Sequence, residues 1–161
     1  MTQPTTPEPT AQKRPGKVDG QAHEFTGIFP LKPGGAEMVR EAVKYRDEHR
    51  GARTLVDTIH DVRTVLIDND TRMLFCTTFD GDWDAYIDDF ASKIPDQLDV
   101  LFGSCEGYPG VHDPNVKDWV IKHQITALEF NSAYPDATVT QIYKALRVLK
   151  AWEELLDVSE G

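Results

Sequence analysis

A β-hairpin pattern near the middle of the chain constrains the fold more than any other feature of the sequence. Residues 54–68 form a long run rich in β-branched side chains, which favour strands. Asn69 and Asp70, residues typical of turns, separate this run from residues 72–79, a second strand-like stretch. The two runs together predict a pair of antiparallel strands.

Strand and helix patterns on both sides of this hairpin supply the other elements. Residues 23–31 alternate in the manner of a half-buried strand, and residues 35–49 carry apolar side chains at helical spacing. After the hairpin, Asp82 is typical of a helix N-cap, and the helix continues through Pro95 to Phe102. Three further elements are predicted: a short helix at residues 113–120, a strand at residues 125–130, and a closing helix that begins at the capping-box residues Thr138 and Gln141.

The predicted order of elements is strand, helix, strand, strand, helix, short helix, strand and closing helix. This order matches the ferredoxin-like βαββαβ arrangement, an α+β fold whose antiparallel sheet carries helices on one face. The other face of the sheet needs a cover, and the common solution is a second copy of the sheet packed across a ligand-sized space. We therefore predict a dimeric α/β barrel, present as a homodimer or as a multiple of dimers.

Residues 1–20 differ in composition from the rest of the chain. They contain four prolines and four threonines and almost nothing apolar, so we predict a disordered Pro-rich arm. Residues 21–161 then form a single domain, in keeping with their number. The arm lacks the apolar stretch of a secretory signal, and no run approaches the roughly 20 apolar residues that span a bilayer. We expect a cytoplasmic protein without a membrane span.

An excess of acidic residues bears on the partners of the chain. The 17 basic and 27 acidic residues give a net charge of -10, and such a surface repels nucleic-acid phosphates. We therefore expect no binding to DNA or RNA. The two cysteines, Cys76 and Cys105, are expected to be free thiols, because the sequence shows no secretory signal.

His60 and Arg63, three residues apart on the first strand of the hairpin, are the candidate catalytic residues. Alternation puts them on opposite faces of the sheet unless a bulge intervenes. A histidine that faces an enclosed space suits proton transfer or iron ligation, and the arginine would orient an anion. The structural alternatives are a histidine hydrogen-bonded inside the sheet or at a dimer seam, and an ion pair of Arg63 with Asp61 or with the acidic first turn of the helix that begins at Asp82.

Phe29, Phe75 and Trp119 are the candidate residues for binding a cofactor or an apolar ligand, because small-molecule sites are mostly apolar cavities with a few polar groups. Core packing is the alternative for all three. No metal site is predicted. The aspartates around Gly81 lack the ligand pattern of a calcium loop, and the histidines lack the spacing of a zinc site.

A set of motifs lies between His60 and Phe90. It comprises His60-x-x-Arg63, the hairpin, the run Phe79-Asp80-Gly81-Asp82, and Tyr86 followed by Asp89-Phe90. This stretch resembles uncharacterised bacterial proteins of the dimeric α/β-barrel, ferredoxin-like superfamily. Relatives in that superfamily include cofactor-independent monooxygenases, polyketide cyclases, and haem proteins similar to chlorite dismutases and dye-decolourising peroxidases. The resemblance makes haem one candidate cofactor and leaves the cofactor otherwise unknown.

Two functions follow from these observations. The leading hypothesis is a homodimer that binds an apolar small molecule beside the sheet and acts as an oxidoreductase, monooxygenase-like or haem-dependent. His60 would be the acid, base or ligand, and Arg63 would orient an anion. The alternative is a non-catalytic assembly or partner-binding protein, in which the strands and the closing helix form interfaces and the arm is a flexible tether.

Overall fold

The structure, a computed structural model, describes residues 15–48 and 56–159. Most of the predicted N-terminal arm, and the beginning of the run predicted at 54–68, lie outside these ranges. No helix within them is long and apolar enough to cross a membrane.

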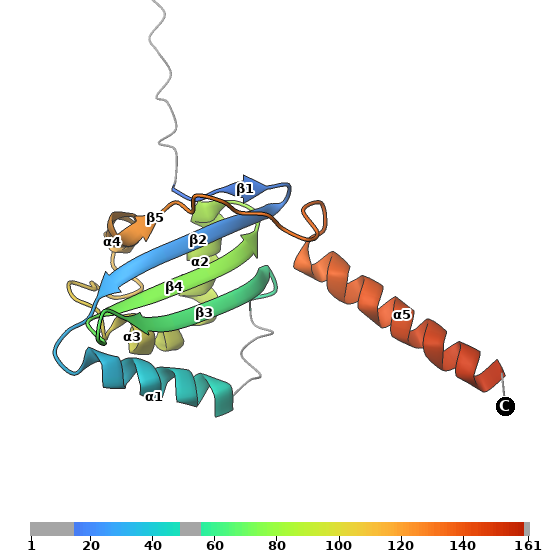
Figure 1. The fold of residues 1–161 in the computed structure, drawn as a ribbon, viewed down its shortest axis with the longest axis horizontal. Helices are drawn as coiled ribbons and strands as arrows, with labels where there is room; N and C mark the ends of the chain where they lie inside the picture. The colour runs from blue at the N-terminus through green and yellow to red at the C-terminus, as the bar shows by residue number, and fades with distance from the viewer. Residues whose placement is uncertain (1–14, 49–55, 160–161) are drawn as a thin grey trace, which may run out of the picture.

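The described chain forms a five-stranded antiparallel sheet (Figure 1). Its two long central strands are β2 (Ala22–Pro30) and β4 (Arg72–Asp80), and β3 (Ile59–Ile67) pairs with the free side of β4. The other side of β2 pairs with two short strands, β1 (Val18–Asp19) and β5 (Gln124–Ile125). The spatial order β5-β2-β4-β3 is compatible with the ferredoxin-like fold predicted from the sequence.

Five helices accompany the sheet in the described part of the chain: α1 (Gly35–Glu48), α2 (Trp83–Lys93), α3 (Pro95–Phe102), α4 (Val116–His123) and α5 (Val139–Ser159). The first four cover one face of the sheet, whereas α5 projects away from the body (Figure 1). The predicted α+β class is therefore confirmed.

Alternating residues of the central strands build the core against helices α1 to α4. Phe25 and Phe29 from β2, together with Met73 and Phe75 from β4, are at most 4% exposed. They share one cluster with side chains of all four helices, among them Val39, Phe90, Leu101 and Trp119. Because alternation points every second side chain to the same side, the intervening residues of β2 and β4 face away from the helices.

Local signals explain where several elements begin. The Asp82 side chain accepts hydrogen bonds from the backbone N–H groups of Asp84, at 2.8 Å, and Ala85, at 3.3 Å, which caps α2 as predicted. Pro95 occupies the first turn of α3, where its missing N–H costs nothing. The hairpin turn contains Asp68, Asn69 and Asp70 at positive φ, a conformation that Asn and Asp tolerate better than most residues.

The strand predicted at residues 125–130 is wrong beyond Ile125, because the segment that follows bonds to side chains instead of a neighbouring strand. β1 already occupies the start of the β2 edge. The backbone N–H of Ala127 donates to Glu24 Oε1 at 2.8 Å, and that of Ser132 donates to Asp19 Oδ2 at 2.8 Å. Val18 and Asp19 were expected in the arm but form β1, so the ordered chain begins before residue 21.

Candidate functional site

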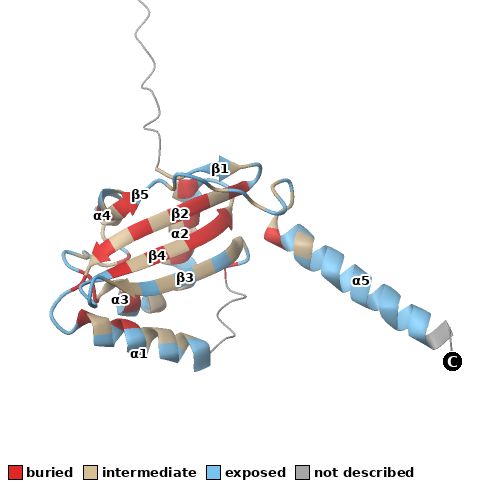
Figure 2. Cartoon of the chain, viewed as in Figure 1, coloured by how far each residue is buried: buried red, intermediate tan, exposed pale blue. Residues whose placement is uncertain are grey.

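The sheet face that points away from helices α1 to α4 is the first part of the candidate site, and we call it the open face. Its members are intervening residues of three neighbouring strands: Thr26 and Ile28 on β2, Leu74, Cys76 and Arg72 on β4, and Arg63, Val65 and Ile67 on β3. Towards the other end of the same side of the sheet, Ala22, Glu24 and Thr78 are buried and do not belong to the open face. Figure 2 shows this face as a mixture of exposed and half-buried residues between the fully buried positions.

The centre of the open face is apolar. The strand register sets Ile28 beside Leu74 and Leu74 beside Val65, so three branched aliphatic side chains form a row across the sheet. Val65 is 46% exposed, and Cys76 is half-buried on the same face. When one face of an antiparallel sheet is exposed to water, the side chains on that face are mostly polar. The apolar centre of the open face therefore indicates a surface that another group covers.

His60 lies at one end of the open face, at an irregularity in the strand pairing. The β3–β4 register shifts between Ile59 and Asp61, which is the bulge that the sequence left open. The His60 Nε2 atom lies 2.7 Å from Asp80 Oδ1, and the two side chains are 17% and 8% exposed. His60 is therefore hydrogen-bonded within the sheet.

Asp80 also ties α5 to the sheet. Its second carboxylate oxygen, Oδ2, accepts a hydrogen bond of 2.7 Å from the backbone N–H of Val139, the first residue of α5. A carboxylate at a helix N-terminus is favourable because it satisfies a free N–H and complements the helix dipole. The His60–Asp80 pair thus joins the end of the open face to the start of α5.

Arg63 is an exposed residue of the open face. Its side chain is 69% exposed, and its Nε atom lies 3.4 Å from Asp61 Oδ1. This is the ion pair that the sequence offered as the structural alternative. Because the partner carboxylate is also exposed, the pair leaves the guanidinium accessible to a second anion.

The three aromatic candidates lie on the opposite side of the sheet, within the core. Phe29 and Trp119 are stacked with ring centres 5.0 Å apart, and Phe75 contacts Phe102 edge to face at 5.3 Å. The Trp119 Nε1–H donates to the backbone oxygen of Glu106 at 3.2 Å. The structure therefore separates the predicted residues into two groups, with His60 and Arg63 toward the open face and the aromatic rings in the core.

Two important carboxylates were missed by sequence reasoning about the site. Asp80 stands in the Phe79-Asp80-Gly81-Asp82 motif, but its link to His60 depends on the strand register. Glu24 is only 5% exposed and accepts from the N–H groups of Lys17 and Ala127 and from the Thr26 hydroxyl. An acidic residue within a mostly apolar strand is the signal that could have marked Glu24.

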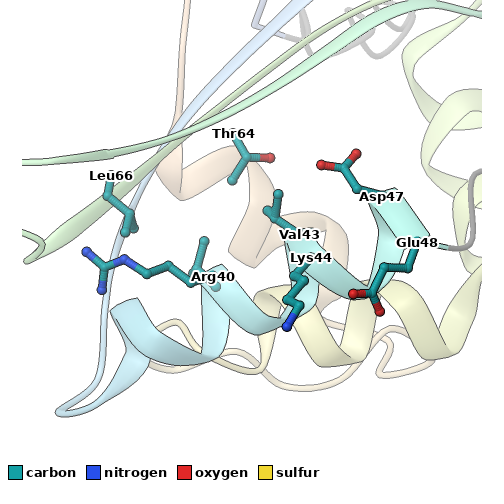
Figure 3. A pocket seen from close by; sticks show the side chains of 8 residues that line it. Arg40, Val43, Lys44, Asp47, Glu48, Thr64 and Leu66 are labelled. Atoms are coloured by element: carbon teal, nitrogen blue, oxygen red, sulfur yellow. The ribbon is translucent and has the colours of Figure 1, made fainter.

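A groove of about 550 Å³ lies elsewhere, between α1 and the edge strand β3. Val43 and Leu66 form part of its floor, and Arg40, Lys44 and Asp47 line its rim (Figure 3). The rim carries charges of both signs, so the groove shows no preference for an anionic or a cationic ligand.

Comparison with models of protein families, with curated proteins and with solved structures finds no match for this chain. The residues of the chain itself must therefore support any functional assignment.

Proposed function

We propose that this chain forms a homodimer that binds an apolar small molecule between the open face and the part of the second copy that covers it. The observation that carries the proposal is the row formed by Ile28, Leu74 and Val65, an apolar centre on a face that the subunit's own helices leave uncovered. Apolar surface with a few polar groups at its margin is typical of small-molecule sites.

The polar groups at this margin suit a proton-transfer step. In the His60–Asp80 pair, the carboxylate orients the imidazole. His60 would accept or donate a proton at the edge of the bound molecule, and Arg63 would orient an anionic group of that molecule. This chemistry agrees with a monooxygenase-like oxidoreductase that works without a cofactor.

A haem group does not fit this arrangement. His60 directs Nε2 to Asp80 rather than to an open space. Phe29, Phe75 and Trp119, which were expected to line a cofactor, pack against neighbouring rings on the other side of the sheet. A haem-dependent step is therefore not part of the proposed function.

An apolar fluorescent probe, 1-anilinonaphthalene-8-sulfonate, tests the ligand proposal. Val65→Asp places a charge in the apolar row, whereas Val18→Asp places the same charge at a 58% exposed position on β1. We expect Val65→Asp to weaken probe binding at least about tenfold, the effect of roughly 1.4 kcal/mol, and Val18→Asp to leave it unchanged. Equal binding by the two variants, or no binding by the unmodified protein, would contradict the proposal.

The second candidate function is a non-catalytic assembly or partner-binding protein. The observation that favours it is α5, whose Leu149 and Trp152 side chains are 52% and 58% exposed. Under this function His60 has a purely structural role. Under this second function, His60→Gln would leave both the native mass and the probe binding of the protein unchanged. Under the first function, His60→Gln would abolish turnover of a substrate.

A further inference from the structure

We infer that α5 of one copy packs its apolar side on the open face of a second copy, so that two copies exchange helices. The inference rests on the proposal that the open face is covered in a dimer, but not on the small molecule. It replaces the partner's sheet by the partner's helix as the cover of this face.

One side of α5 is apolar over about half of the helix circumference, at 100° per residue. The exposed large side chains on this side, which we call the α5 apolar side, are Leu146, Val148, Leu149, Trp152 and Leu155. Ala145 leaves a shallow hollow beside Val148, Leu149 and Trp152, into which a side chain of another surface can fit. A helix stripe of this width is typical of packing against a broad surface such as a sheet.

Most charged residues of α5 lie on its other side and are divided along its length, whereas Glu153 lies at the edge of the apolar side, roughly 20° from Leu146 around the helix axis. Lys144, Arg147 and Lys150 occupy the first two-thirds, and the acidic residues Glu153, Glu154 and Asp157 follow near the end. This polar side would remain in water when the apolar side is covered.

The dimensions and charges of α5 and the open face agree. A helix of 21 residues is roughly 30 Å long, and a strand of nine residues spans roughly the same distance. The open face carries two exposed arginines, Arg63 and Arg72, each of which already pairs with an exposed aspartate of its own subunit, Asp61 and Asp68. The acidic end of α5 would find cations there, which matters because copies with a net charge of -10 otherwise repel each other.

The subunit's own open face is not the surface that α5 covers. The hydrogen bond from the Val139 N–H to Asp80 holds the first turn at the end of β4, and Val139 is buried there. From this point α5 runs away from the sheet, and it is exposed along almost its whole length (Figure 2). Each copy thus presents two different apolar surfaces, the α5 apolar side and the open face. A two-fold axis would place the α5 apolar side of each copy on the open face of the other copy.

Cys76 on the open face provides the test, because Cys105 is fully buried and does not compete. We would place single cysteines on the α5 apolar side, by Leu149→Cys, Trp152→Cys and Leu155→Cys, and on the polar side by Lys150→Cys. A disulfide requires Cα atoms within about 7 Å. We expect mild oxidation to give covalent dimers with at least one of the first three variants, none with Lys150→Cys, and none when Cys76→Ser is added.

Other results identify other occupants and overturn the inference. Dimers that persist with Cys76→Ser show that α5 pairs with α5, and a disulfide within a monomer shows that α5 folds onto its own sheet. A monomeric native mass without any disulfide shows that nothing covers the face.

Alkylation of Cys76 gives a second measurement that needs no new disulfide. We expect Trp152→Asp to speed alkylation at least about fivefold and to halve the native mass, and Lys150→Asp to change neither. Both variants should fold, because none of the α5 side chains that the structure describes belongs to the core cluster. Equal alkylation rates would overturn the inference. The fluorescent probe is measured on the same proteins, because its binding tests the ligand proposal alone. Disulfides that form in a protein without probe binding would contradict the ligand proposal and leave the α5 inference standing.

Discussion

Replacing Asp80 by alanine removes the acceptor of two hydrogen bonds at once. His60 Nε2 and the Val139 N–H each lie 2.7 Å from a different oxygen of this carboxylate. A hydrogen bond to a charged group contributes about 1.5–3 kcal/mol, and the low end applies here because water can enter beside the shorter side chain. We therefore expect Asp80→Ala to lower the free energy of unfolding by about 3 kcal/mol.

Asp82→Ala is a matched control two residues away. Asp82 is exposed and caps α2 through its side chain, so its loss should cost only about 1 kcal/mol. Urea unfolding followed by tryptophan fluorescence measures both values. Hydrogen exchange at the Val139 amide should also accelerate in Asp80→Ala and remain unchanged in Asp82→Ala. If the two variants unfold at the same urea concentration, the His60–Asp80–Val139 link does not stabilise the fold as we argue.

Three further changes test other parts of the structure. Gly27→Ala would drive a methyl group into the buried ring of Phe29, so thermal unfolding should show that the free energy of unfolding falls by about 1–3 kcal/mol; an unchanged melting temperature would refute this packing. Burial raises the pKa of Cys105 to about 11, so a thiol reagent should label Cys76 in the native protein and Cys105 only after unfolding; mass spectrometry of the labelled peptides decides this. Burial lowers the pKa of His23 below its ordinary value of 6.5. As the pH drops below 6.5, the His23 imidazole is protonated more readily in the unfolded chain than in the folded chain, so the free energy of unfolding falls. His23→Gln should make this fall shallower in urea titrations at several pH values, and an identical pH profile would exclude His23 as a cause.

The order of the elements could be predicted from the sequence because local signals determine it. The β-branched hairpin, the Asp82 cap and the first-turn Pro95 each act within a few residues of the chain. The alternation of β2 likewise identified Phe25 and Phe29 as side chains of one face.

The candidate site could be predicted only in part, because its contacts join distant residues. Asp80 is twenty positions from His60 and fifty-nine from Val139 in the chain. The bulge that turns His60 toward Asp80 depends on how β3 pairs with β4, which periodicity does not reveal. The strand predicted at residues 125–130 failed for a similar reason, since Glu24 takes the N–H of Ala127 that a strand partner would have bonded.

The anchoring of α5 at its first residue has a consequence for the behaviour of concentrated protein. A helix that leaves one molecule and docks on a second molecule can take part in two kinds of assembly. The two molecules can exchange helices with each other, which gives a closed dimer, or each molecule can dock its helix on a further molecule, which gives an open chain. The direction in which α5 leaves Val139 would decide between these outcomes, because the hydrogen bond to Asp80 fixes the first residue of the helix. If α5 docks as we infer, a small change in this direction would convert a closed pair into an open-ended fibre.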